Sequence, residues 1–280
     1  MFTAGPASRL ARRASPLLAA MVVIHACDFP TAPGFPESAV PFAPPAAYET
    51  WWQLTAACAG VTRDFDSVRW YVVPGARSIP YGDAQYQGLW YRAGNRIVLA
   101  EHSTLRGGLV RHEMLHALID RANHPRDYYR ERCGGLVVCA GECEDEVGPD
   151  VAVSGTMSRL ESWELDLDVE VIAASAEPES DMGWLGVLVS VTNPHAEARM
   201  VKLGATGARP PLPTFGYALA LPGAEALRET YEYALDTAVV FGPGETRQRL
   251  FDLWLPSSDW EVRGLFGGGA TTAVQLTTGR

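Results

Sequence analysis

Residues 112–116 read His-Glu-Met-Leu-His, an HExxH pattern in which two histidines are four residues apart. On a helix, positions i and i+4 lie one above the other, so both imidazoles can bind one metal ion. Glu113 lies one step around the helix, where its carboxylate can reach a water on that ion without binding the ion itself. The pattern predicts a zinc site with Glu113 as general base. Apolar residues flank the histidines, as in a buried helix: Leu109, Val110, Met114, Leu115, Leu118 and Ile119.

A third ligand is expected, because a catalytic zinc usually has three protein ligands and one water. We expect His124, since Asn123 suits the end of one helix and Pro125 suits the first turn of the next. Asp120 is an alternative because it continues the stripe of His112 and His116, although it is better placed to orient a ligand histidine by a hydrogen bond. A carboxylate from a later segment also remains open, namely Glu142, Glu144 or Glu146.

The stretch resembles the zincin metallopeptidases, the superfamily defined by HExxH. Residues 112–129, HEMLHALIDRANHPRDYY, are similar to the SprT-like and related minimal zincins. Those proteins carry a histidine that opens the next helix and an aromatic residue soon after, which matches His124 and Tyr128. The stretch departs from the longer HExxHxxGxxH pattern, because Ile119 replaces the glycine and the third histidine comes two residues later. The resemblance implies a zinc peptidase and indicates little about its substrate.

Other groups near the motif are weaker candidates. Tyr128, Tyr129 and Arg111 are candidates for stabilising an oxyanion, on sequence proximity alone. His102 precedes the metal-site helix, and we interpret it as a loop histidine rather than a ligand.

Residues 1–26 have the features of an export signal. Three arginines precede an apolar run over residues 16–26, which is too short to span a bilayer stably. The end of this run and the next residue, Ile24-His25-Ala26-Cys27, resemble the lipobox of bacterial lipoproteins, in which the cysteine becomes the lipidated N-terminus. His25 departs from the small residue usual there. We expect lipid anchoring through Cys27 in the bacterial cell envelope, at its periplasmic face or the cell surface; a plain secretory signal or an uncleaved anchor is the alternative.

Charge and cysteine content agree with export. Removal of residues 1–26 takes away three arginines and no acid, which changes the net charge from −10 to −13 and argues against a nucleic-acid partner. Apart from Cys27, the chain has an even number of cysteines, as is typical of disulfides in exported proteins. We expect one bridge between the helix that carries the first cysteine and the loop after the metal site; the four are Cys58, Cys133, Cys139 and Cys143. An all-cysteine metal site is the alternative, but the spacing lacks a Cys-x2-Cys pair.

The chain divides into segments of different pattern. Residues 27–45 are rich in proline and predict an extended tether. Residues 46–150 predict the order of a minimal zincin: a helix over 46–61, a strand over 68–73, a hairpin over 88–100, and then the metal-site helix. In that family the strand before the active helix is an edge strand that an extended peptide joins, and residues 97–101 occupy that position here.

Residues 158–280 alternate between short apolar strands and turns, which predicts a β-sandwich that resembles immunoglobulin-like accessory domains. Residues 228–234 are expected to form a short helix or a loop. Strands are expected over residues 163–172, 187–194, 215–219, 237–241, 250–255, 260–266 and 271–276.

The predicted fold class is therefore α+β, with a small zincin-like catalytic domain followed by an all-β, immunoglobulin-like sandwich. We expect a membrane-anchored zinc metallopeptidase that acts on a peptide or protein. The alternatives are a non-catalytic binding or adhesion lipoprotein whose zinc site is structural or degenerate, and an envelope scaffold that holds no metal. The sequence does not indicate a partner for the sandwich.

Overall fold

The computed structural model describes residues 34–139, 158–160, 164–173, 182–202, 213–221, 228–233, 238–256, 258–266 and 269–277. The predicted signal peptide, Cys27, Cys143 and the three late glutamates lie outside the described residues. The elements below belong to one compact unit, residues 35–280. It contains both helices and many strands, which confirms the predicted α+β class. Within the described ranges, no helix combines the length and the apolar character needed to cross a membrane.

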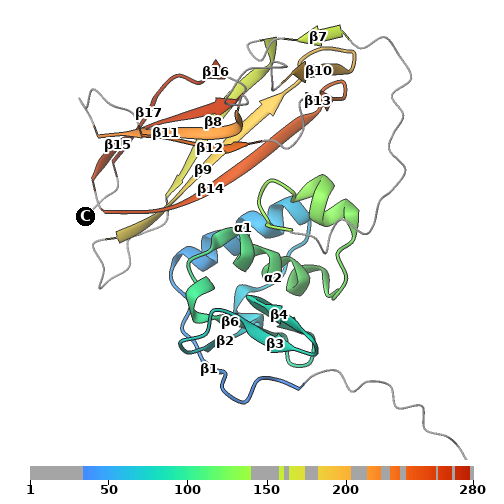
Figure 1. Ribbon diagram of the computed structural model, residues 1–280, viewed down its shortest axis with the longest axis vertical. Coiled ribbons are helices and arrows are strands. Elements are labelled where there is room, and N and C mark those ends of the chain that lie inside the picture. The colour runs from blue at the N-terminus through green and yellow to red at the C-terminus, as the bar shows by residue number, and fades with distance from the viewer. Residues whose placement is uncertain are drawn as a thin grey trace, which may run out of the picture. The chain divides into compact units, whose positions relative to one another are not determined.

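The first half contains a four-stranded sheet with the strand order β1-β2-β6-β5 (Figure 1). Strand β2 runs parallel to β6, and β5 pairs antiparallel with β6 through the predicted hairpin. A small separate hairpin, β3–β4, precedes β5. The bounds are β1 Val40–Pro41, β2 Arg69–Val73, β3 Ile79–Tyr81, β4 Ala84–Tyr86, β5 Gly88–Tyr91 and β6 Arg96–Ala100.

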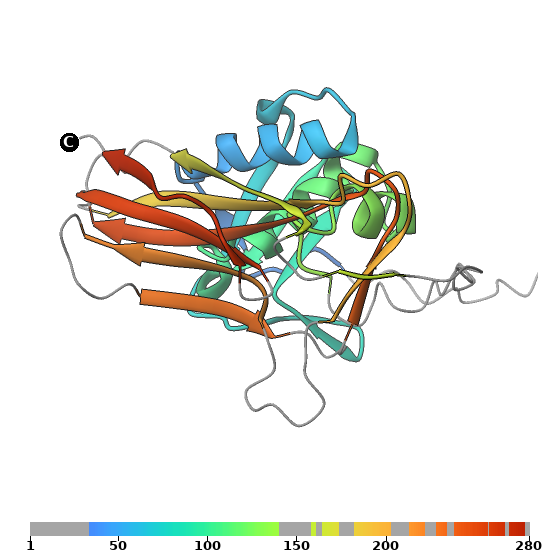
Figure 2. The same cartoon turned by 90° about the horizontal axis from the view of Figure 1, so that it is seen from above.

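Two longer helices, α1 (Ala47–Ala59) and α2 (Gly107–Ile119), pack against each other (Figure 2). Helix α1 ends as predicted at Gly60, whose φ of 66° suits glycine in the left-handed region. The two helices and the sheet share an apolar core that contains Tyr48, Trp51, Trp52, Ile97, Leu99, Met114 and Leu118. Short turns complete this half: η1 Phe65–Ser67, η2 Glu101–Ser103 and η3 Asp127–Arg132, the last a π-helical turn.

In its described residues, the second half consists of strands joined by turns and irregular chain, without an α-helix. One sheet has the order β14-β9-β8, and a second has the order β12-β11-β15-β16, with β17 also paired to β15. Buried side chains of both sheets meet in one core, so the two sheets lie face to face (Figure 1): Val187, Val189, Tyr217, Leu219 and Val262. A third sheet has the order β13-β10-β7.

The strands of this half have the following bounds: β7 Ser158–Leu160, β8 Asp166–Ala173, β9 Met182–Thr192, β10 Arg199–Lys202, β11 Pro213–Ala220, β12 Arg228–Tyr233, β13 Ala238–Phe241, β14 Thr246–Pro256, β15 Asp259–Phe266, β16 Gly269–Ala270 and β17 Val274–Thr277.

Two local predictions were wrong. Residues 97–101 do not form an edge strand: β6 lies between β2 and β5, because β2 pairs with it in parallel, and β5 is the edge. Residues 228–233 form strand β12 rather than a helix or loop, and this strand pairs antiparallel with β11.

The predicted tether gives way to packed structure before residue 45. The ring of Phe35 contacts Tyr71 and Tyr91 at centroid distances of 4.9 and 5.3 Å, and Val40–Pro41 pairs with β2 as strand β1. The apolar residues among the prolines are what bring this segment onto the sheet.

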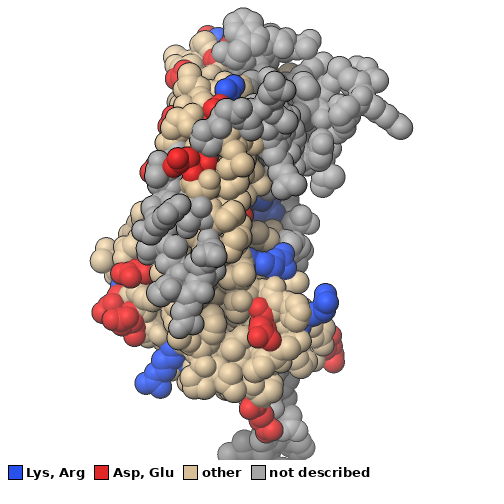
Figure 3. Space-filling model, turned by 90° about the vertical axis from the view of Figure 1, so that its left-hand side faces the viewer, with Lys and Arg blue, Asp and Glu red and all other residues tan. Residues whose placement is uncertain are grey.

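Charged side chains on one face of the molecule are interspersed (Figure 3). Among the described residues that are visible there, basic and acidic groups alternate over a largely uncharged surface. The described residues on that face thus carry charges of both signs.

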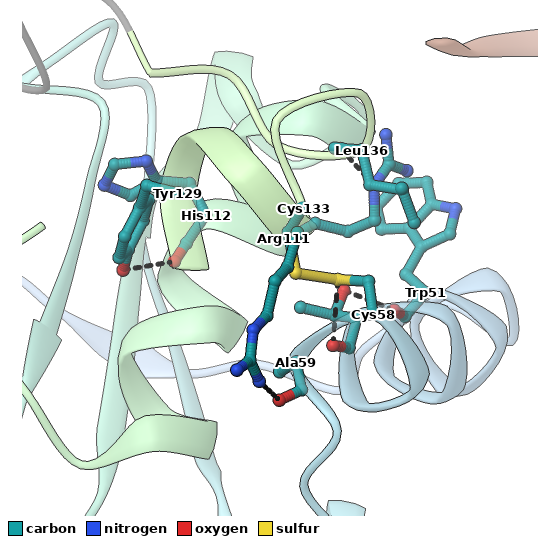
Figure 4. The surroundings of a disulfide bond; sticks show 10 residues. Trp51, Cys58, Ala59, Arg111, His112, Tyr129, Cys133 and Leu136 are labelled. Carbon is teal, nitrogen blue, oxygen red and sulfur yellow. Dashed lines mark hydrogen bonds between the residues drawn. A yellow bond between two sulfur atoms is a disulfide. The ribbon is translucent and has the colours of Figure 1, made fainter. Parts of the chain in front are cut away.

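A disulfide joins Cys58 of α1 to Cys133 at the end of η3 (Figure 4), as predicted for a bridge from this helix to the loop after the metal site. Both cysteines pack in an apolar cluster with Leu115, Tyr129 and Val137. Cys139 is also disulfide-bonded, with a partner outside the described residues.

Replacement of Cys58 and Cys133 by alanine should lower the free energy of unfolding. The bridge closes a loop with a sequence separation of 75 residues, for which restriction of the unfolded chain corresponds to about 4 kcal/mol. Chemical denaturation of the double variant beside the wild type measures the difference. Equal midpoints and slopes would show that the bridge contributes no stability.

Candidate metal centre

Three histidines from α2 and the segment after it converge on one point. The Nε2 atom of His112 lies 3.2 Å from that of His116 and 3.0 Å from that of His124. One ligand atom of each of the three lies within 4.8 Å of the others. The structure therefore brings together the two motif histidines and the predicted third histidine.

Main-chain carbonyls fix the orientation of the two motif histidines. His112 Nδ1 lies 2.9 Å from the Val138 carbonyl oxygen, and His116 Nδ1 lies 2.7 Å from that of Arg121. A carbonyl oxygen only accepts, so each Nδ1 must donate its proton. In the neutral imidazole this leaves a lone pair on Nε2. Both lone pairs point into the space that the three histidines share.

Facing lone pairs repel unless a cation lies between them, and the spacing fits zinc. Tetrahedral zinc with Zn–N bonds of 2.0–2.1 Å places its nitrogen ligands about 3.3 Å apart. The observed separations of 3.2 and 3.0 Å are close to that value. Three neutral imidazoles are also a donor set that zinc favours in catalytic sites, where a fourth position stays open.

Burial favours the neutral form of His112 and His116. Loss of hydration, together with the neighbouring histidines, lowers the pKa of His112 to about 3. Loss of hydration likewise lowers the pKa of His116 to about 4. The neutral form is the form that binds a metal ion, so protons compete weakly for these nitrogens at neutral pH.

The end of α2 places His124. The helix stops at Ile119 and not at Asn123, where its end was predicted, because Asp120 adopts the left-handed cap conformation with φ of 56°, which turns the chain back. Asp120 itself points away from the histidines and forms a two-bonded ion pair with Arg92, at 3.0 and 2.8 Å. Its predicted role of orienting a ligand histidine was therefore wrong, because the main chain at Arg121 makes that contact instead.

Tyr129, rather than Tyr128, packs against the histidines. Its ring centroid lies 5.0 Å from His112, 5.2 Å from His116 and 4.9 Å from His124. Tyr128 lies beneath the guanidinium of Arg132, in the apolar cluster around the disulfide. Tyr128 was matched through the resemblance, and sequence proximity left both tyrosines open as oxyanion groups; of the two, Tyr129 is the one beside the histidines. The Tyr129 hydroxyl points at the main-chain oxygen of His112, 3.5 Å away (Figure 4).

Glu113 lies beside the metal ligands and against the edge strand. It is 5% exposed, and a Cβ atom built on Gly88 would lie 2.9 Å from its Cγ. Only glycine at position 88 therefore leaves room for the Glu113 side chain. A cavity of about 200 Å³ is lined by Glu113, the three histidines, β5 and two tyrosines of the β3–β4 hairpin, Tyr81 and Tyr86.

Two further sequence candidates lie elsewhere, and one site residue was missed. Arg111 points to the opposite side of α2 and pairs with Asp252, so it is not an oxyanion group at the histidines. His102 bonds to the Ala76 carbonyl oxygen. Trp90 was not predicted, although its ring stacks on His116 at 6.1 Å and 6°. A tryptophan in the predicted hairpin before an HExxH helix is the signal that could have found it.

Comparisons with known proteins give little similarity. No family model matches the chain, and no curated protein matches it. Structural genomics target SoR45 matches with a TM-score of 0.29 and 13% identity over 42% of this chain and 89% of its own. The putative ApaA protein from Bordetella pertussis matches with a TM-score of 0.28 and 18% identity, over 41% of this chain and 96% of its own. A protein from Archaeoglobus fulgidus matches with a TM-score of 0.21 and 13% identity, over 41% of this chain and 98% of its own. These TM-scores are too low to support a fold or a function.

Removal of the third imidazole should weaken zinc binding steeply. His124→Ala takes away one of three converging ligands, so we expect a loss beyond the roughly 10–100-fold typical of residues that only hydrogen-bond to a ligand. Asp120→Asn is the matched control: its side chain pairs with exposed Arg92, and affinity should stay close to wild type. Competitive zinc titration measures both.

The same titration tests the remaining alternative for the third ligand. Wild-type affinity in His124→Ala, together with a loss in Glu142→Gln, Glu144→Gln or Glu146→Gln, would show that the third ligand is a carboxylate.

Proposed function

We propose that this protein is a zinc-dependent metallopeptidase that hydrolyses peptide bonds. The observation that carries the proposal is the convergence of three imidazole Nε2 atoms beside a buried glutamate in one cavity. A purely structural zinc site usually has four protein ligands and no open position. Here the described donor set has three, and the cavity lies next to a strand edge.

The chemistry divides between metal and protein. When bound, zinc lowers the pKa of a coordinated water toward about 7 and polarises a carbonyl group. Glu113 accepts the proton of the attacking water and later delivers it to the leaving amine. Burial of Glu113 between α2 and Gly88 holds its carboxylate in place for both transfers. Trp90 stacks on the His116 ring, and Tyr129 contacts all three imidazoles at tilted or edge-on angles, so both limit rotation of the imidazole rings.

The edge of β5 provides a place for an extended substrate. Ala100 donates its N–H to the Gln87 carbonyl oxygen, and Gly88 is opposite Leu99 in the register. In an antiparallel pair, hydrogen-bonded and non-bonded positions alternate. The main-chain groups of Gly88 and Trp90 therefore point away from β6, toward the open edge. An extended peptide can add there as a further strand, directly beside Glu113 and His116.

The finer assignments of fold and location belong to the same proposal. The order of α1, the sheet and α2 supports a zincin-like catalytic domain, and the two facing sheets support an immunoglobulin-like accessory domain. The sequence around Cys27 supports a lipid anchor in the bacterial cell envelope. A peptide or protein outside the cytoplasm is the substrate class that fits these features together.

Substitution of Glu113 separates catalysis from metal binding. Glu113→Ala should retain zinc and lose peptidase activity by about 10²–10⁴-fold, because the ligands remain and the proton acceptor is gone. Zinc stoichiometry and cleavage of a peptide library are measured on the same preparations. A wild-type cleavage rate in this variant would show that the mechanism is wrong.

The same measurements distinguish the alternative functions. Zinc bound by the wild type without turnover of any peptide would favour a structural zinc site in a binding lipoprotein. Failure of the wild type to bind zinc would remove the metal from the proposal altogether.

Pairing with β5 predicts a pattern in the substrate. Once a cleaved peptide is known, N-methylation at successive amides should lower kcat/KM by about 2- to 10-fold at alternate positions near the cleaved bond, since each lost hydrogen bond is worth about 0.5–1.5 kcal/mol. The control is the same peptide methylated far from that bond. Equal effects at neighbouring positions would argue against strand addition.

A further inference from the structure

Helix α2 contacts strand β14 on the side opposite to the histidines. Arg111 directly precedes His112, and neighbouring helical residues point about 100° apart. Its side chain is 1% exposed. The guanidinium donates two bonds to the Asp252 carboxylate, from NH1 at 2.6 Å and from NH2 at 2.9 Å. Asp252 lies in the middle of β14, 141 residues away in the chain.

The segment 134–138 connects this pair to the metal ligand. Arg111 Nε donates to the Leu136 carbonyl oxygen at 2.7 Å (Figure 4). Two residues on, the Val138 carbonyl oxygen accepts from Nδ1 of His112 at 2.9 Å. The Val138 N–H in turn donates to the Gly108 carbonyl oxygen at 3.0 Å. The carbonyl that orients His112 is thus held in place by groups of α2 itself.

Strand β14 holds the same segment directly. The Leu250 N–H donates to the Gly135 carbonyl oxygen at 2.9 Å. Glycine is required at two positions that face β14, one in the segment 134–138 and one in α2. A Cβ on Gly135 would overlap the Gln248 carbonyl oxygen, and a Cβ on Gly107 would overlap the Asp252 carboxylate. The close approach leaves little freedom for the segment to shift relative to the strand.

Aromatic packing closes the contact around the ion pair. Trp184 of β9 donates Nε1–H to Asp252 Oδ1 at 3.1 Å, so that carboxylate oxygen has two donors. The ring of Trp51 in α1 contacts Trp184 at 5.8 Å and Trp254 at 6.3 Å, and the Arg111 guanidinium lies 5.6 Å from it. The pair is therefore shielded from water, where charge-assisted bonds fix geometry most firmly.

We propose that Asp252 is a positioning residue for the metal centre, and that strand β14, although it belongs to the sandwich, also supports that centre. Through Arg111 and the segment 134–138, the strand fixes the Val138 carbonyl and with it the tautomer and direction of His112. The proposal rests on the proposed metal site, and not on peptidase activity.

The test is competitive zinc titration of the full chain with Asp252→Asn, which retains the shape of the side chain and removes its charge. We expect zinc affinity to fall by about 10–100-fold, as for other groups that orient a ligand. Replacement of zinc by Co²⁺ adds a spectroscopic readout, because the visible absorption of Co²⁺ depends on ligand geometry. The Asp252→Asn spectrum should differ from that of the wild type.

Val189→Ala is the matched control for general destabilisation. Val189 is fully buried in the sandwich core on β9. Its truncation should lower the denaturation midpoint while zinc affinity and the Co²⁺ spectrum stay at wild-type values. A comparable loss of zinc affinity in Val189→Ala would mean that stability, not position, controls the site, and would overturn the proposal.

If Asp252→Asn does not fold, a second variant tests the same proposal. The double variant Arg111→Met with Asp252→Leu replaces both buried charges by apolar groups of similar volume, which is often tolerated. It should fold and still bind zinc more weakly, because the Leu136 carbonyl loses its donor. Wild-type affinity and spectrum in a folded variant of either kind would overturn the proposal. If the wild type itself binds no zinc, the proposed function fails instead.

Discussion

Two main-chain carbonyl oxygens, those of Val138 and Arg121, determine what the three histidines can do. By accepting the Nδ1 protons of His112 and His116, they leave the Nε2 lone pairs facing one another. Both carbonyls belong to chain that has already left α2. The left-handed turn at Asp120 places the Arg121 carbonyl, while the π-turn, the disulfide and strand β14 place the Val138 carbonyl. The HExxH helix supplies ligands, and the rest of the fold sets their direction.

Local pattern predicted the parts of the site that depend on local geometry. The spacing of His112 and His116 needs only a helix, and the placement of His124 needs only a helix that ends before Pro125. Helix α1, strand β2 and the β5–β6 hairpin were predicted for the same reason. Each is specified by periodicity and by nearby glycine or asparagine.

The errors arose where the outcome depends on distant partners or on one residue of register. Tyr128 and Tyr129 are adjacent, and sequence proximity alone does not decide which of the two rings faces the histidines. Whether β6 is an edge depends on β2, which precedes it by more than twenty residues. The role of Arg111 depends on Asp252, and no local pattern relates two residues 141 positions apart. The described structure supplies these relations, and they decide which groups face the cavity.

The ion pair of Arg111 and Asp252 contributes more to the relative placement of the elements than to the free energy of unfolding. Removing two charges from water is costly, so a buried pair is weak evidence for added stability. Its bonds are directional, however, and they link a helix, a loop and a strand at one point. The facing lone pairs of the histidines likewise oppose folding until a cation is present. Binding of a metal ion by the three histidines would therefore relieve a repulsion that folding creates, and would couple metal affinity to stability through the same backbone segment.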